Sequence, residues 1–270
     1  DKKAYSNWLN EKMHLVSAFV EPKKIRTGKY DILLSPKVFG SLLLDTVGFW
    51  ASGKARLDGI GAFKEQGERV ASESFSASVD GRLDNAMASF SVDAEGNKTA
   101  KKQVVEKGIF KDYFYDQRYA SYFNESSNGC ALRTSALGPE KLYTSSPYCG
   151  AHNLVIEPGK EKLENILSDM KGIFVENAGI ATADPETGTF GFELRNAFIV
   201  DKGVLTPARY AVFSGTVQDL LKNVVLTKET QQVSEDGGAE FSSACVCAHA
   251  LVGGQNLAGA SNVGVKRSRE

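Results

Sequence analysis

The sequence contains few of the residues that mark the simplest functional classes. It has 4 cysteines, 3 histidines and 7 prolines in 270 residues, and 4 cysteines are too few for a disulfide scaffold at this length. No apolar run approaches the roughly 20 residues of a membrane-spanning helix, because Asp45 and Thr46 interrupt the longest candidate, around residues 40–51. No secretory signal is visible. These absences predict a reducing, cytoplasmic setting without a membrane partner.

Neither sign of charge dominates the chain. The 32 Lys and Arg balance 33 Asp and Glu, which gives a formal net charge of -1. This balance excludes a strongly basic nucleic-acid binder and an acidic disordered chain. The glycine-rich nucleotide motifs and the G-x-S-x-G motif of α/β-hydrolases are missing too. We therefore do not expect nucleic acid as a partner.

Hydrophobic periodicity predicts four helices along the chain. They are expected at about 4–20, from a Ser35-Pro36 cap to about Trp50, at 160–170, and in a segment capped by Ser214. Most other segments predict short strands joined by turns, with a strand at 71–79 and a polar, glycine-rich loop at 231–240. The lack of regular β-α alternation predicts an α+β fold. Its core would be a mostly antiparallel sheet or a barrel with a few packed helices, and a mixed sheet is the alternative.

Two short segments predict similar hairpins. Residues 105–110 and 200–205 match class for class, and each has a Lys-Gly pair where a tight turn needs positive φ. The likeness could reflect an internal duplication or two independent uses of one turn, and six residues do not decide between them.

One spacing in the chain resembles a metal site. On a strand, Cys245, Cys247 and His249 would share one face. Residues two apart on a strand are about 6.8 Å apart, whereas ligands of one tetrahedral zinc must lie within about 4 Å of each other. Cys149 and His152 could join such a cluster, but the geometry favours a packing role for all five residues.

Asp45 is a carboxylate inside an apolar helical segment. It could act as a general base or a metal-associated acid. Because no His or Cys lies near it in the sequence, a position on the exposed or interfacial side of the helix is the preferred interpretation.

Eight segments, taken in chain order, carry a family resemblance. They are G-K-Y-D-I-L-L-S-P (28–36), S-L-L-L-D-T-V-G-F (41–49), S-V-D-A-E-G (91–96), V-E-K-G-I-F (105–110), N-L-V-I-E-P-G (153–159), T-G-T-F (187–190), F-I-V-D-K-G-V (198–204) and G-Q-N-L-A-G (254–259). In order and spacing they resemble the TldD/PmbA family, often labelled "modulator of DNA gyrase". The resemblance implies a C-terminal domain over 28–265. A connecting helix at 1–27 would end a missing N-terminal domain, and 266–270 would be a tail.

The resemblance also implies a choice between two arms of the family. TldD-like subunits are metallopeptidases with H-E-x-x-x-H on the early helix and a later Cys as third ligand, whereas PmbA/TldE-like subunits lack these residues and pair with a TldD-like subunit. On this sequence the two His positions fall at Leu44 and Phe49, the Glu falls at Asp45, and the Cys falls near Val233 or Ser234. Leu and Phe have no lone pair to give to zinc.

The resemblance therefore implies a PmbA/TldE-like, non-catalytic subunit. The complex would cleave unfolded or extended peptides in proteolysis and peptide maturation, and zinc would be a cofactor of the TldD-like partner only. Two alternatives stay open. One is an active metallopeptidase with a non-standard ligand set drawn from Cys149, His152, Cys245, Cys247 and His249. The other is a self-associating protein, such as a dimer, that holds peptides without cleaving them.

Overall fold

The computed structural model describes residues 5, 6, 9, 13, 19, 21–133, 143–234 and 243–259. Most of the helix expected at 4–20 and the whole tail at 266–270 lie outside these residues. Within the described part of the chain, no helix is both long enough and apolar enough to cross a membrane.

Strands are the most abundant regular structure in the described chain. They are β1 (Lys23–Lys24), β2 (Gly28–Leu34), β3 (Ala77–Asp80), β4 (Lys101–Glu106), β5 (Ile109–Phe110), β6 (Ala131–Leu132), β7 (Tyr148–Cys149), β8 (Asn153–Ile156), β9 (Lys171–Ala178), β10 (Thr189–Asp201), β11 (Val204–Arg209), β12 (Ala211–Thr216), β13 (Val224–Ser234) and β14 (Ala244–Gly259). The helices are α2 (Pro36–Asp45), α3 (Val47–Trp50), α4 (Gly53–Asp58), α5 (Gln117–Phe123), α6 (Leu163–Asp169) and α7 (Val217–Lys222).

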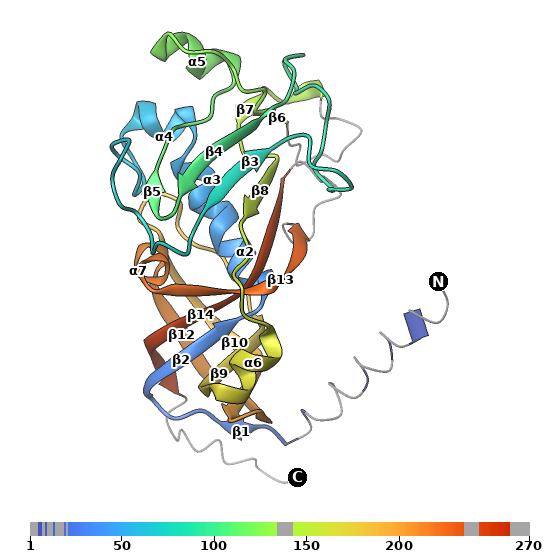
Figure 1. Ribbon diagram of the computed structural model, residues 1–270, viewed down its shortest axis with the longest axis vertical. Helices are drawn as coiled ribbons and strands as arrows, with labels where there is room; N and C mark the ends of the chain where they lie inside the picture. The colour runs from blue at the N-terminus through green and yellow to red at the C-terminus, as the bar shows by residue number, and fades with distance from the viewer. Residues whose placement is uncertain are drawn as a thin grey trace, which may run out of the picture.

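Five of the strands close into a barrel. The sheet runs β1-β11-β10-β9-β2-β14-β8-β3-β4-β5, and β12 pairs with both β10 and β14, so that β10, β9, β2, β14 and β12 form a ring. Among the strands of the described residues, the parallel pairs are β2/β9, β8/β14 and β1/β11. The α+β prediction with a mostly antiparallel, barrel-like core is therefore confirmed. Figure 1 shows the barrel at one end of the molecule, and β3, β4, β5 and β8 with α4 and α5 at the other.

Helix α2 connects these two ends, and local sequence determines its start. The Ser35 hydroxyl caps it by accepting from the Val38 amide at 3.4 Å, and Pro36 takes the first helical position. The helix ends at Thr46, whose hydroxyl donates to the Leu42 carbonyl at 2.6 Å. The predicted continuous helix to Trp50 is thus two helices, α2 and α3, because the side chain of Thr46 competes for a backbone acceptor and the backbone there is distorted from ideal helical dihedral angles (φ -112°, ψ -74°).

Three local predictions need correction. Helix α7 is capped by Thr216, whose hydroxyl accepts from the Asp219 amide at 3.2 Å, and Ser214 lies in β12 instead. The strand expected at 71–79 begins only at Ala77, because the hydroxyls of Ser72 and Ser74 bind the Val224 carbonyl at 3.1 and 2.7 Å and hold the preceding chain in a turn.

The third correction concerns the loop expected at 231–240. Its first four residues complete β13 and pair with Ala244–Cys247 of β14, so the cross-strand pairing overrides their polar composition. The rest of that segment lies outside the described residues.

Both predicted hairpins are confirmed. Lys107 and Gly108 have φ of 48° and 76°, and Lys202 and Gly203 have φ of 46° and 83°. The two turns differ in their surroundings. A methyl group at Gly108 would lie 2.3 Å from the Ala71 carbonyl oxygen, whereas the nearest atom to one at Gly203 is Ser168 Cα at 3.7 Å.

This contrast predicts different costs for the same substitution. Gly203→Ala should lower the free energy of unfolding by about 1 kcal/mol, the cost of positive φ for an L-residue. Gly108→Ala should cost about 1–3 kcal/mol more, because backbone must also move. Urea unfolding of the two variants measures the difference, and equal losses would contradict it.

Candidate functional site

A pocket of about 360 Å³ lies beside the break between α2 and α3. Leu44 and Phe49, the two positions at which the resemblance predicts the family's histidines, both line it. In a regular helix, residues five apart point about 140° away from each other. The break at Thr46 lets both side chains face one cavity. We call it the relic pocket; it is also lined by Gly48, Lys54, Asp116, Arg118, Tyr119, Leu132, Pro147, Tyr148, Cys149, Gly150, Ala151 and Ser243.

The position aligned with the third ligand lies alongside the same helix. Val233 is buried, and a methyl group at Gly40 of α2 would lie 3.5 Å from its Cβ. Ser234 pairs with Ala244, which follows the pocket-lining Ser243. The structure thus places Val233 against α2, and neither Val233 nor Ser234 lines the relic pocket.

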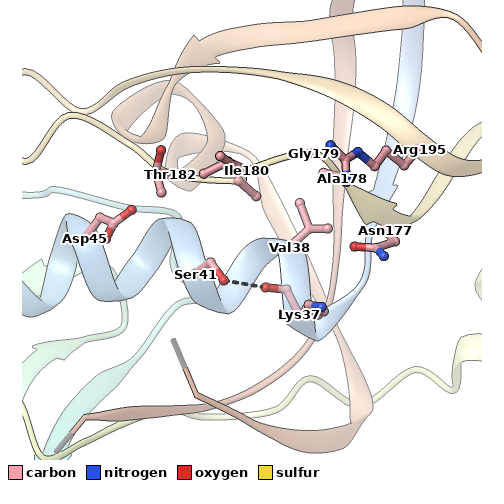
Figure 2. Close-up of a pocket in the computed structure, with 11 residues that line it drawn as sticks. Lys37, Val38, Ser41, Asp45, Asn177, Ala178, Gly179, Ile180, Thr182 and Arg195 are labelled. Carbon is pink, nitrogen blue, oxygen red and sulfur yellow. Dashed lines mark hydrogen bonds between the residues drawn. The ribbon is translucent and has the colours of Figure 1, made fainter. Parts of the chain in front are cut away.

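Asp45 lies apart from this arrangement. Its Oδ2 accepts a hydrogen bond from the Ala183 amide at 2.9 Å. It lines a second cavity, of about 610 Å³, between α2 and the segment that follows β9 (Figure 2). Asp45 is half-buried, as expected for an interfacial position on the helix.

The residues at the expected ligand positions do not fit the zinc site of the metallopeptidase arm. The side chains of Leu44, Phe49 and Val233 have no atom that can bind zinc, and the hydroxyl of Ser234 would be the one oxygen of the aligned set. Across the described ranges, no three His, Cys, Asp or Glu side chains lie together as a metal-binding group. That this chain holds no zinc stays a prediction.

The cysteines of the alternative ligand set lie in two separate places. Cys149 is in the wall of the relic pocket, where its thiol donates to the Phe114 carbonyl at 3.6 Å, and burial raises the pKa of the Cys149 thiol to about 12. Cys245 and Cys247 face α2 instead, and the Cys247 thiol donates to the Pro36 carbonyl at 3.4 Å. The hydrogen bond with Cys247, and then burial, raise the pKa of the Cys245 thiol.

The two described histidines are also apart. The ring of His152 is buried beside Phe90, with Nε2 2.9 Å from the Gly129 carbonyl oxygen. His249 lines a cavity of about 330 Å³ near the start of α2. The five alternative ligands are therefore not brought into one cluster.

The sequence reasoning missed the cavity that contains Asp45. Lys37, Ser41, Asn177 and Arg195 also line it. Asn177 and Arg195 come from β9 and β10, and no sequence spacing places them near α2. Among these residues only Asp45 is indicated by the sequence, as a carboxylate inside an apolar helical segment.

The fold and the pocket have known relatives. The model of the PmbA/TldA metallopeptidase C-terminal domain matches residues 27–259. The chain belongs to this family. It is 28% identical over 235 residues to a metalloprotease of Methanocaldococcus jannaschii. This match covers 84% of this chain and 50% of that protein. It is also 25% identical over 235 residues to a "Metalloprotease TldD homolog" of Buchnera aphidicola. This match covers 86% of this chain and 47% of that protein. The chain thus spans about half the length of these relatives.

The fold also matches the crystal structure of TldE from Thermococcus kodakarensis. The TM-score is 0.75 at 22% identity, with 87% of this chain and 51% of that chain covered. This likeness establishes the shared fold of the PmbA/TldD C-terminal domain.

The burial of the cysteines predicts low thiol reactivity. All four are free and buried, and burial raises the pKa of both the Cys130 and Cys149 thiols. The thiolate is the reactive form. Ellman's reagent at pH 8 should therefore label the native chain far more slowly than free cysteine, and should label four thiols in urea. Rapid labelling of one thiol in the native chain would contradict this.

The buried His152 predicts a pH-dependent stability. Burial lowers the pKa of its imidazole below the usual 6.5, and Nδ1 has no partner among the described residues. The unfolded chain therefore takes up the proton first as the pH falls, so the free energy of unfolding should decrease below about pH 6.5.

The matched variant is His152→Gln, whose amide can still donate to the Gly129 carbonyl. Urea unfolding at several pH values should show that the free energy of unfolding decreases less at acid pH in this variant. His249, whose pKa burial also lowers, should supply the remainder. An unchanged slope would show that His152 is not a source of the pH dependence.

Proposed function

We propose that this chain is a non-catalytic, PmbA/TldE-like subunit of a two-part peptidase. The observation that carries the proposal is the relic pocket, which Leu44 and Phe49 line beside the helix break, at the positions where the family resemblance implies histidines. Family membership supports the peptidase context, and the likeness to TldE concerns the fold. In this proposal a TldD-like partner supplies the zinc and the chemistry.

The lining of the relic pocket supports contact with peptide. Leu44, Phe49, Pro147 and Tyr148 give it an apolar wall, which suits a hydrophobic side chain of an extended substrate. Lys54, Asp116 and Arg118 add polar groups at its border. Unfolded or extended peptides, whose side chains are accessible, are the substrate class that this pocket fits best.

The test is reconstitution with a TldD-like subunit from the same source. Native mass spectrometry should detect a complex of the two chains, and cleavage of an unfolded peptide should require the TldD-like chain. A partner whose metal-binding histidines are replaced serves as the control and should give no activity. A stable homo-oligomer that ignores the partner would contradict the proposal and favour a self-associating peptide-binding protein.

The peptide contact gives a second prediction. In the reconstituted complex, Phe49→Ala should raise KM for a hydrophobic peptide about three- to tenfold and leave kcat nearly unchanged, because the pocket binds and does not react. Phe90→Ala is the matched control, since Phe90 is an exposed aromatic beside His152 and does not line the pocket. A fall in kcat with unchanged KM for Phe49→Ala would contradict a binding role.

A further inference from the structure

The cavity of about 330 Å³ beside the start of α2 has a polar lining, since every described residue that lines it has a polar side chain. It shares no lining residue with the relic pocket. Lys37 and Asn177 also line the cavity that contains Asp45, and Figure 2 shows them at the end of that cavity away from Asp45. We call this space the His249 cavity; its lining residues are Ser35, Lys37, Glu176, Asn177, Asn196, Gln231 and His249.

Two irregularities in strand pairing help to build the His249 cavity. In β10 the register shifts on both sides of Asn196, which pairs with Asn177 of β9. In β13 the three residues 227–229 lie opposite the single residue His249 of β14. Bulges redirect side chains and are frequent beside functional sites. Both irregularities occur at residues that line this one cavity or lie opposite such a residue.

The His249 side chain has hydrogen-bonding capacity that the fold does not use. It is only 6% exposed, and its ring packs beside the buried Phe174 with 5.9 Å between the ring centroids. Neither ring nitrogen forms a hydrogen bond with another described residue, and Nδ1 is fully buried. Buried polar groups in native proteins usually have a partner, so a group bound in the cavity would supply one.

Three of the lining residues are already engaged in the fold. Lys37 and Glu176 each interact with another residue of the chain, and their charges have opposite signs. The Ser35 hydroxyl donates to the Glu176 backbone carbonyl at 2.8 Å and accepts from the Val38 amide at 3.4 Å. The described lining therefore has one charge of each sign and selects neither an anion nor a cation.

The other lining side chains are neutral groups that both donate and accept. Asn177, Asn196 and Gln231 have carboxamides, and none of these carboxamides forms a hydrogen bond with another described residue. The pairing of Asn196 with Asn177 across the strands places these two side chains next to each other. Burial lowers the pKa of His249, so its ring is neutral at pH 7 and has one donor and one acceptor.

These neutral groups favour a primary carboxamide as the ligand. A carboxamide has two N–H donors and one carbonyl acceptor, so it can pair with a second carboxamide through two hydrogen bonds. No Phe, Tyr or Trp among the described residues lines the cavity, which disfavours a nucleobase, because nucleobases stack on such rings. The volume of about 330 Å³ far exceeds the roughly 30 Å³ of one water molecule, so the space admits a side chain.

We propose that the His249 cavity binds a primary carboxamide. The carboxamides of Asn177, Asn196 and Gln231 pair with it, and the His249 ring takes a remaining hydrogen bond. The bound group belongs either to an Asn or Gln side chain of an extended peptide or to a free small molecule such as glutamine. The peptide source rests on the proposed function, whereas the carboxamide chemistry does not.

The first experiment compares three peptides by calorimetry on the full chain. They have the form acetyl-Ala-X-Ala-N-methylamide, where X is Gln, Met or Glu, so they share one backbone and have no other primary carboxamide. Met has about the length of Gln without its hydrogen bonds, and Glu has the shape of Gln with a charge. The Gln peptide should bind about tenfold more tightly than either, the gain from one or two neutral hydrogen bonds.

Two variants connect this preference to the cavity. Gln231 is exposed, so Gln231→Met should keep the fold, and the preference for the Gln peptide should fall below about threefold. The matched control is Gln117→Met, which changes an exposed glutamine of α5 that lines neither this cavity nor the relic pocket. This control should keep the full preference.

The second experiment uses the small number of histidines as reporters. With 3 histidines in the chain, the side-chain nitrogen signals can be assigned from His152→Gln and His249→Gln. The Gln peptide should shift the signal of His249 and leave that of His152 unchanged. Free glutamine is the second probe: a shift with the peptide alone supports the peptide source, and an equal shift with glutamine supports a small-molecule source.

The outcomes separate the inference from the proposed function. Equal binding of the Gln and Met peptides, or of the Gln and Glu peptides, would overturn the carboxamide inference and leave the subunit role to the reconstitution test. A His249 signal that no probe shifts would show that the cavity holds water only and would overturn it too. A Gln231→Met chain that keeps the full preference would also contradict the inference, because the carboxamide would then bind elsewhere.

Discussion

The close contact between α2 and strands β13 and β14 positions the relic pocket and the cavity that contains Asp45, which both lie beside this helix. It depends on Gly40, where a methyl group would lie 3.2 Å from Cys247 Sγ and 3.5 Å from the Cβ of Val233. A glycine at this point lets the helix approach the sheet closely, and the buried Cys245 and Cys247 fill the space beneath it. With the helix held there, one side of it faces the relic pocket and another faces the cavity that contains Asp45.

The break at Thr46 then decides what the end of α2 can do. It brings positions 44 and 49, at which the family resemblance implies two metal-binding histidines, to one cavity. In this chain the cavity instead has apolar walls, and Asp45 is bonded to the Ala183 amide on the other side of the helix. The helix break therefore places two side chains at one cavity, and in this chain both side chains are apolar and cannot bind a metal ion. This contrast is the basis of the proposed role beside a catalytic partner.

The features that could be predicted from sequence are local ones. The Ser35-Pro36 start of α2 and the two Lys-Gly turns depend on a few adjacent residues, and the structure confirms them. The closure of the barrel by β12 and the bulge beside Asn196 depend on pairing between distant strands, which periodicity does not encode. Leu44 and Phe49 lie in one short segment and could be matched to a family motif, whereas the lining of one cavity by Lys37 of α2 and Arg195 of β10 could not be foreseen.

The zinc content of the purified chain tests the central claim most directly. Elemental mass spectrometry of the native chain, beside a chelator-treated sample, gives the stoichiometry. The account predicts a zinc content far below one equivalent, because the aligned positions 44, 49 and 233 have no zinc-binding atoms. One tightly held equivalent, lost on unfolding, would contradict the account and would show that this chain forms a metal site of its own.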